Sequence, residues 1–186
     1  MKAYFDIDAL VESGLIRSEL EYERALIADR KLHILAKENS KLKKLRMELR
    51  ALIEGYEKEE WSDVDTLTEE KLRESDEAER IAEVERAFFE ERKQLIRKKL
   101  KELDLTQENL GFVLGHKSKT HMSELMNGIK PFTLKDLIII NRVLQIDISV
   151  LIPRFLSKED QVKVNKAVEV LNKPKIKLVT DELLFS

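Results

Sequence analysis

The sequence of 186 residues contains no cysteine, which excludes a disulfide framework, a thiolate nucleophile and a zinc site built on cysteine. It has only five glycines and three prolines, and this scarcity favours long helices over turn-rich β-structure. No run of about 18 apolar residues is present, so no segment is expected to span a membrane. The first ten residues, MKAYFDIDAL, carry acids early and do not resemble a secretory signal. We therefore expect an unexported, cytoplasmic protein.

Patterns that carry catalysis or bind metals are also lacking. The three histidines are His33, His116 and His121, and no two of them have the HxxxH spacing of a metal site on a helix. Acidic residues are abundant, but none forms a recognisable pair for acid–base chemistry, and no glycine-rich phosphate loop occurs. We therefore expect no catalytic residue, no metal and no cofactor, and a function other than that of an enzyme.

Charge is distributed unevenly along the chain. The net charge is −2, but residues 1–88 hold 16 Lys and Arg against 23 Asp and Glu, whereas residues 89–186 hold 18 against 13. This asymmetry indicates a basic half that binds an anionic partner and an acidic half that binds something else. The alternative is that both halves are simply well-solvated helical surfaces.

Three helices are predicted near the N-terminus. Residues 4–16 form a short helix closed by Gly14. A capping box from Ser18 to Glu21 then starts a helix that runs to about residue 37. Residues 42–56 repeat apolar side chains at three- and four-residue spacing, so the second and third helices are expected to form an antiparallel hairpin. The apolar face of the second helix is predicted to consist of Leu20, Leu26, Ile27, Ile34 and Leu35.

An acidic segment leads into a long helical pattern. Residues 57–85 carry 13 acids and four bases, and a capping box runs from Thr66 to Glu69. The pattern then continues to Leu103, either as one helix or as two with a break near residues 75–76. Neither proline nor glycine occurs in residues 56–110, so the connection between the two halves is expected to be helical and stiff.

Short helices with their own caps follow residue 103. Thr106 caps one that ends at Gly115, Ser118 caps a second that ends at residues 127–128, and Thr133 caps a third that spans 134–144. A fourth is expected after Ser149, at residues 151–155. The tail contains one more helical stretch, at 162–171, followed by residues 175–178, which are either strand-like or disordered.

The first two short helices form a pair in which only one face of the second helix is apolar. The side chains expected to pack between them are Leu110, Val113, Leu114, Met122, Leu125 and Met126. Those expected to face outward are Ser118, Lys119, Thr120, His121, Ser123, Glu124 and Asn127. The major groove of DNA is about 12 Å wide and admits one helix. A short helix with a polar outer face, packed against a second helix on its apolar face, is therefore typical of the recognition helix of a DNA-binding protein.

This stretch resembles a known family. The segments LTQENLGFVLG, SKTHMSELMNG and PFTLKDLIIINRVLQIDISVLI are similar to the Xre/Cro-type helix-turn-helix of phage repressors and bacterial regulators, over residues 93–155. The turn, with His116 and Lys117 before Ser118, is one residue longer than the commonest form. The resemblance implies an all-α fold in which long N-terminal helices and a helical hairpin precede a five-helix, lambda-repressor-like DNA-binding domain and a short tail.

The whole chain is also similar to the HigA-like antitoxins. These place an acidic helical N-terminal region before the same DNA-binding domain and bind a small RNA-cleaving toxin. The N-terminal similarity rests on the segment LVESGLIRSELEYERALI. It implies that residues 1–88 bind a small basic toxin or mediate dimerisation, that residues 89–156 bind DNA and that residues 157–186 form a tail.

The family resemblance assigns roles to individual residues. Gln107 holds the position of a glutamine that bonds a phosphate, although it is also a good helix former at a helix start. Lys119, Thr120 and Glu124 hold positions that usually meet base edges, where they can contact guanine, thymine and cytosine respectively. Glu124 has the alternative of pairing with Lys119 or Thr120. The other predicted DNA-contacting residues, most of them at the backbone, are Lys117, Ser118, His121, Ser123, Asn127 and Lys130.

The sequence thus predicts a type II antitoxin that neutralises an mRNA-cleaving toxin and represses its own operon. It would bind double-stranded operator DNA as a homodimer, with its two reader helices about 34 Å apart. The first alternative is a stand-alone Xre-family repressor without a toxin, whose N-terminal helices serve dimerisation. The second is a helical scaffold protein with a degenerate helix-turn-helix that does not bind DNA.

Overall fold

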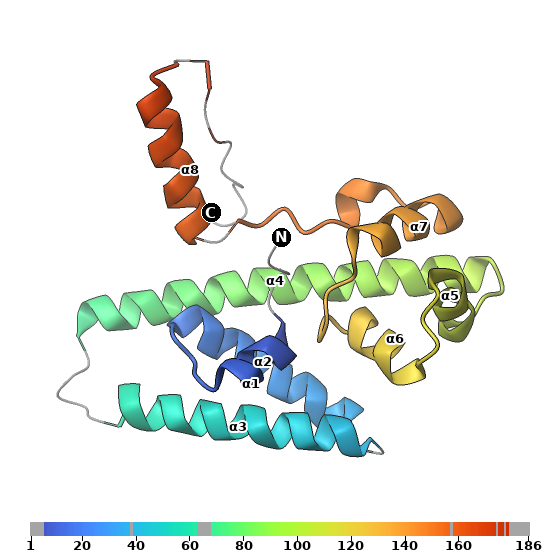
Figure 1. Cartoon of the computed structure of the whole chain (residues 1–186), viewed down its shortest axis with the longest axis horizontal. Helices are drawn as coiled ribbons and strands as arrows, with labels where there is room; N and C mark the ends of the chain where they lie inside the picture. The colour runs from blue at the N-terminus through green and yellow to red at the C-terminus, as the bar shows by residue number, and fades with distance from the viewer. Residues whose placement is uncertain are drawn as a thin grey trace.

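The computed structural model describes residues 6–37, 39–62, 68–156, 158–173, 175, 176 and 178. Over these ranges every regular element is a helix and none is a strand, which confirms the predicted all-α class. The elements are α1 (Ile7–Ser13), α2 (Glu19–Leu35), α3 (Ser40–Glu60), α4 (Glu69–Glu102), α5 (Gln107–Leu114), α6 (Lys119–Met126), α7 (Leu134–Leu144), the 3-10 turn η2 (Ile148–Val150) and α8 (Lys158–Leu171). Figure 1 shows the long helix α4 with α2 packed against its first half, α1 and α3 beside α2, and the short helices α5, α6 and α7 at the far end of α4.

The predicted starts and ends of the first two helices are largely confirmed. The Asp6 carboxylate accepts from two amides at the start of α1, and Gly14 closes that helix in a left-handed conformation, with φ at 70°. The Ser18 hydroxyl accepts from the amide of Glu21, which starts α2. The Glu21 carboxylate, however, accepts from the amide of Arg17, so the predicted capping box is displaced by one residue.

Helices α2 and α3 form the predicted hairpin. They are joined by a short turn and lie side by side (Figure 1), with Asn39 capping α3. The Arg46 guanidinium binds the Asp29 carboxylate at 2.8 Å between them. The predicted apolar face of α2 is wrong in part: Ala25, Ala28 and Leu32 are buried, whereas Ile34 is 67% exposed. Small alanines line the contact because α2 is enclosed by both α3 and α4.

Helix α4 is one unbroken helix of 34 residues, which settles the question that the sequence left open. Thr68 caps it, while Thr66, the cap expected from the sequence, lies outside the described residues. Ala78 and Ala82 are buried in the first half of α4, and the Glu85 carboxylate accepts from Arg24 of α2 at 2.7 Å. Ile96 and Leu100 are buried in its second half. One rigid element therefore holds the N-terminal helices and the short C-terminal helices in a common frame.

The buried apolar side chains form two cores. The N-terminal core consists of Ile7, Leu10, Ile16, Ala25, Ala28, Leu32, Ala36, Leu42, Leu45, Leu49, Ile53 and Ile129. The C-terminal core consists of Ile96, Leu100, Leu110, Leu114, Met122, Leu125, Met126, Phe132, Leu137, Ile140, Leu144, Ile146 and Leu151. Ile129 is the exception to the sequence order, because it follows α6 yet belongs to the N-terminal core.

The end of the chain departs from the prediction at one element. The fourth short helix, expected at 151–155 after Ser149, is instead the 3-10 turn η2, which Asp147 caps. Pro153 follows this turn, where it does not interrupt a helix. The predicted tail helix is present as α8, and residues 174 and 177, within and next to the strand-like stretch, lie outside the described residues. None of the helices that the structure describes is both long enough and apolar enough to cross a membrane.

Candidate nucleic-acid interface

Helices α5 and α6 form the predicted helix-turn-helix pair. Thr106 and Asn109 make a full capping box at the start of α5, and the Ser118 hydroxyl accepts from the amide of His121 at the start of α6. Gly115 ends α5 with φ at 81°, a left-handed conformation that favours glycine. The two helices cross closely, since a Cβ atom on Gly111 would lie 2.8 Å from the Cγ of Met122. The predicted starts and ends of both helices are confirmed.

The apolar side chains predicted to pack between α5 and α6 are confirmed, with one correction. Leu110, Leu114, Met122, Leu125 and Met126 are all buried in the C-terminal core. Val113, expected to pack with them, is 44% exposed. It follows Phe112, which is 86% exposed. Sequence periodicity identifies an apolar stripe, but it does not show how wide a stripe the partner helix covers.

The long turn between α5 and α6 is anchored to α7. The Nε2 atom of His116 lies 3.2 Å from the Oδ1 atom of Asp136. Asp136 is buried and also closes the capping box of α7, where its other oxygen accepts from the amide and hydroxyl of Thr133. The long turn therefore has a structural role, because its residue His116 ties the start of α6 to the start of α7.

Four predicted DNA-contacting residues lie at the N-terminal ends of α5 and α6. Lys117, Ser118 and Lys119 are exposed, and Gln107 is half-buried in the first turn of α5. The ammonium of Lys119 lies 2.6 Å from a carboxylate oxygen of Glu108, but the side chain of Lys119 is 79% exposed. An exposed ion pair of this kind contributes little and is readily exchanged for a phosphate or a base.

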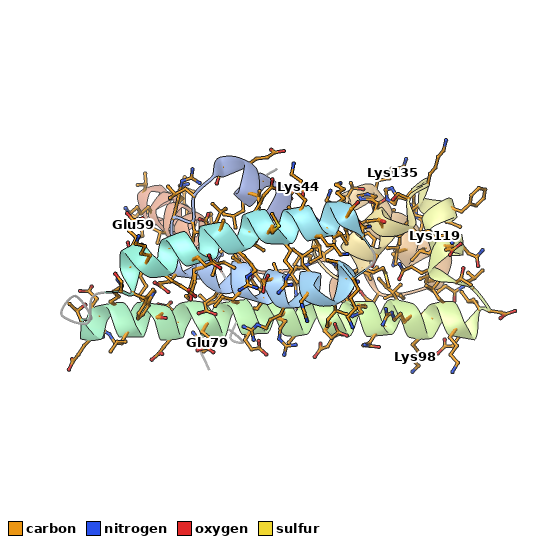
Figure 2. The ribbon with its side chains drawn as sticks, turned by 90° about the horizontal axis from the view of Figure 1, so that it is seen from below. Lys44, Glu59, Glu79, Lys98, Lys119 and Lys135 are labelled. Atoms are coloured by element: carbon orange, nitrogen blue, oxygen red, sulfur yellow. The ribbon has the colours of Figure 1, made fainter. Side chains whose placement is uncertain are left out.

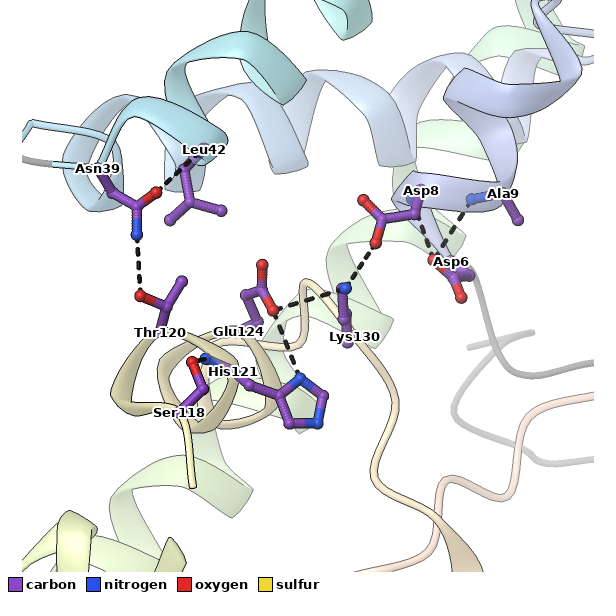
Figure 3. A network of polar contacts seen from close by, with 10 residues as sticks. All are labelled: Asp6, Asp8, Ala9, Asn39, Leu42, Ser118, Thr120, His121, Glu124 and Lys130. Atoms are coloured by element: carbon purple, nitrogen blue, oxygen red, sulfur yellow. Dashed lines mark hydrogen bonds and ion pairs between the residues drawn. The ribbon is translucent and has the colours of Figure 1, made fainter. Parts of the chain in front are cut away.

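Glu124 does not lie where the sequence placed it. It was expected to face outward, but only 2% of its side chain is exposed, so that expectation is wrong. Its Oε2 atom lies 3.6 Å from Lys130 and 3.5 Å from the Nδ1 atom of His121, rather than beside Lys119 or Thr120. Its Oε1 atom has no hydrogen-bond partner among the described residues. Glu124 is buried because the N-terminal helices lie over this face of α6 (Figure 3).

Three contacts join α6 and the residues after it to the N-terminal helices. The Nδ2 atom of Asn39 donates to the hydroxyl of Thr120 at 2.9 Å. The ammonium of Lys31 donates to the main-chain oxygen of Asn127 at 3.0 Å. The ammonium of Lys130 lies 2.5 Å from a carboxylate oxygen of Asp8 (Figure 3). Three predicted DNA-contacting residues thus bind elements of their own chain.

Ser123 and Asn127 contact each other at the end of α6. The side-chain amide of Asn127 donates to the main-chain oxygen of Ser123 at 2.8 Å, and both residues are half-buried. Asn127 therefore caps the last turn of α6, a role that its position just before Gly128 also favours.

The residues that reach α6 from the N-terminal helices were missed by the sequence analysis. Asp8, Lys31 and Asn39 lie in segments whose local pattern explains them fully as parts of helices or caps. Lys31 and Asn127 are 96 residues apart, and Asn39 and Thr120 are 81 residues apart. Only Glu124 gave a local signal, because an acid at a DNA-reading position requires a cationic partner.

Burial and neighbouring charges shift the pKa values of the two lysines in these contacts in opposite directions. Burial lowers the pKa of Lys31 to about 8. Burial also acts to lower the pKa of Lys130, but its hydrogen bond to Asp8 and the charge of Glu124 outweigh that effect and raise it. Lys130 therefore remains a cation in this site, whereas Lys31 carries its charge at an energetic cost near neutral pH.

Charged side chains are distributed unevenly along the long axis of the molecule. Figure 2 shows Glu59 and Glu79 toward one end and Lys98, Lys119 and Lys135 at the end that carries α5 to α7. Lys44 lies between these two groups, so the labelled residues agree with the predicted asymmetry without a strict separation of the two signs. Within the described part of the chain, no group of three or more histidine, aspartate or glutamate residues has the arrangement of a metal site.

Comparison with known families supports the interpretation of this region. A family model described as Helix-turn-helix matches residues 96–151, which covers the end of α4 through η2. Searches of curated proteins and of solved structures gave no match. Residues 96–151 are an Xre/Cro-type helix-turn-helix domain, and such a domain indicates a DNA-binding transcription regulator.

Proposed function

We propose that this regulator binds a specific double-stranded DNA site through α6 and represses transcription at that site. The observation that carries the proposal is the braced α6 helix, with Lys117, Ser118 and Lys119 exposed at its N-terminal end. Lysine donates to the O6 and N7 atoms of guanine, and a helix N-terminus with an exposed hydroxyl suits a phosphate. We propose that Gln107, at the start of α5, bonds a second phosphate.

The ten predicted DNA contacts fall into two groups under this proposal. Gln107, Lys117, Ser118 and Lys119 are accessible in the described conformation. The other six lie on or beside the face of α6 that the N-terminal helices contact, and they are Thr120, His121, Ser123, Glu124, Asn127 and Lys130. We propose that a homodimer presents two reader helices to a pseudo-palindromic site.

The acidic end of the molecule supports a second part of the proposal, the binding of a small basic toxin. Glu57 and Glu59 of α3 and Glu69, Glu70 and Glu74 of α4 are all exposed there. Lys58 and Arg73 are also exposed there, but acids are in excess, and an excess of one sign of charge attracts a partner of the other sign. Together with the resemblance to HigA-like antitoxins, this surface makes the N-terminal helices the proposed toxin-binding region.

A stand-alone repressor is the second candidate, and one observation favours it. Asn39, which caps α3, contacts α6 of the same chain, and α1 and α2 contact the residues that follow α6, so the N-terminal region has a role even without a toxin. An antitoxin and a stand-alone repressor share the same DNA-binding chemistry and differ only in the partner of the acidic end.

DNA binding is tested by selecting duplexes from a random library with the full chain at low salt. The proposal predicts an enriched pseudo-palindrome whose half-sites are about one helical turn apart, and affinity that falls as salt rises. Equal binding to all duplexes, or none at low salt, would contradict it.

The toxin is tested by expressing the reading frame next to this gene in cells, with and without the chain. Growth arrest that the wild-type chain relieves, and that a Glu59→Lys/Glu70→Lys variant does not, is the expected result. Glu91→Lys, at an exposed position of α4 away from the acidic end, is the matched control. No growth arrest, or equal rescue by all three chains, would favour the stand-alone repressor.

A further inference from the structure

We propose that the N-terminal helices hold the reader helix α6 in a closed state that does not bind DNA. The proposal rests on the proposed function of α6 in DNA binding and adds a form of regulation to it. In this state α1 and α2 and the turn before α3 form a cover over the face of α6 that carries Thr120 and Glu124. Release of the cover exposes that face to DNA.

The contacts of the cover reach the first turn of α6 and the residues that follow its last turn. Asn39 reaches Thr120 in the first turn, and Lys31 reaches the main-chain oxygen of Asn127 at the end. Between them, Glu124 lies 3.6 Å from Lys130, which in turn binds Asp8 of α1 (Figure 3). Contacts from three separate places in the N-terminal region thus converge on α6 and the residues directly after it.

The cover and the DNA compete for the same space. A major groove about 12 Å wide admits one helix and no second layer packed on its reading face. Glu124 is only 2% exposed, and the hydroxyl of Thr120 already accepts a hydrogen bond from Asn39. Neither side chain can reach a base edge while the N-terminal helices remain in place.

An apolar contact anchors the cover next to α6. Ile129 is 1% exposed and belongs to the N-terminal core, although it follows the reader helix directly. Gly128 lies against Phe89 of α4, whose Cγ atom would be 3.2 Å from a Cβ atom at that position. Opening therefore withdraws Ile129 from the N-terminal core while the C-terminal core stays intact.

The closed interface also contains features that favour its release. The Oε1 atom of Glu124 is buried without a hydrogen-bond partner among the described residues, which is costly for a carboxylate. Lys31 is half-buried, and the positive charges of Lys93, Arg86 and Arg92 act against its own charge while Glu90 favours it. These two costs reduce the stability of the closed state, so a ligand that binds the open state better can shift the equilibrium toward it.

DNA affinity provides the first test, using the full chain and the duplex selected from the random library. Lys31→Ala and Asn39→Ala break the cover from its N-terminal side and leave every proposed DNA contact unchanged. We expect each to bind the duplex about tenfold more tightly than the wild type, because the apparent affinity scales with the competent fraction. Loss of a positive charge alone would weaken binding to DNA, so a higher affinity of Lys31→Ala for the duplex would indicate release of the cover.

Lys44→Ala is the matched control for charge. Lys44 is 77% exposed, pairs only with Glu48 on its own helix and does not touch α6 in the described contacts. It should leave the affinity unchanged or slightly lower. Equal affinities for the wild type, Lys31→Ala and Asn39→Ala would overturn the closed state and leave the proposed DNA binding intact.

Thiol labelling tests the cover without DNA. The chain has no cysteine, so Ile129→Cys and Ile140→Cys each introduce a single buried thiol, the first under the cover and the second in the C-terminal core. Opening predicts that Lys31→Ala raises the labelling rate of the first about tenfold and leaves the second protected. No change at either position would overturn the cover, and so would equal acceleration at both, because that result reports unfolding of the whole domain.

The two tests separate failure of the inference from failure of the proposed function. Absence of DNA binding in every variant, with selective labelling at position 129, would contradict the DNA-binding function and keep the cover. DNA binding without any gain in the variants, together with unchanged labelling, would contradict the cover alone.

Discussion

The side-chain amide of Asn39 donates to the hydroxyl of Thr120 at 2.9 Å, so the residue that caps α3 also contacts the reader helix. Its Oδ1 atom accepts from the amide of Leu42 at the start of α3, and its Nδ2 atom faces α6. One asparagine thereby links the helical hairpin to the helix-turn-helix. This link makes the position of the N-terminal helices relevant to what α6 can bind.

Two glycines in helices should respond oppositely to alanine. In Gly111→Ala the new Cβ would lie 2.8 Å from Met122, a buried side chain, and we expect destabilisation by about 1–3 kcal/mol from overpacking. In Gly55→Ala the new Cβ meets nothing within 4 Å, so we expect stabilisation by about 0.5–1 kcal/mol from helix propensity. Urea unfolding of both variants checks this pair, and a stabilising Gly111→Ala would contradict the close crossing of α5 and α6.

Removal of Arg92 should destabilise the helix-turn-helix domain. Arg92 is 5% exposed, donates to the main-chain oxygen of Leu151 at 3.2 Å, and lies 4.9 Å from the ring of Phe89 and 5.2 Å from that of Phe132. Arg92→Ala leaves a cavity and an unpaired carbonyl, so we expect a loss of about 2–4 kcal/mol in the free energy of unfolding.

Arg97→Ala is the matched control for Arg92, because Arg97 is exposed on the same helix. We expect it to change the free energy of unfolding by no more than about 0.5 kcal/mol. Similar effects of the two substitutions in thermal or urea unfolding would show that Arg92 does not anchor α4 to η2.

The half-buried Lys31 should make stability depend on alkaline pH. Burial lowers its pKa to about 8 in the folded chain, from 10.5 when exposed. Between these two values the unfolded chain binds one more proton than the folded chain, so this lysine contributes stability that rises with pH from about 8. Below pH 8 the lysine is charged in both states, and its contribution is constant at its lowest value.

The pH dependence of Lys31 is isolated by comparison with Lys31→Met. Burial and nearby glutamates raise the pKa of Tyr22 and Tyr56, and these two tyrosines act in the opposite sense above pH 10. The difference in unfolding free energy between wild type and variant, measured from pH 7 to 9.5, should therefore increase with pH in favour of the wild type. A constant difference would show that Lys31 is not buried as the structure has it.

The short helices around the candidate site could be predicted because their caps are local. Thr106, Ser118 and Thr133 each accept from an amide three residues ahead, and that spacing is visible in the sequence. The apolar side chains of α3 and α6 were also predictable, since helical periodicity identifies a buried face.

The cover over α6 could not be predicted, because its contacts join residues that are far apart in the sequence. Periodicity shows that a face is polar, but it does not show whether solvent, DNA or another helix of the same chain contacts it. The burial of Glu124 depends on residues more than 80 positions away, such as Asn39 and Asp8, which have ordinary local roles as helix cap and first-turn acid. Ile129 likewise lies just after the reader helix in sequence and in the opposite core in space.

The most direct test of the account is the affinity of the selected duplex for Lys119→Ala, measured by fluorescence anisotropy beside the wild type and Lys44→Ala. Both lysines are highly exposed, so each substitution removes one charge with little effect on folding. If α6 reads DNA, Lys119→Ala should weaken binding by about tenfold or more and relax the preference for the selected sequence, whereas Lys44→Ala should not. Equal affinities for all three chains, with the sequence preference unchanged, would contradict the assignment of α6 as the reader helix.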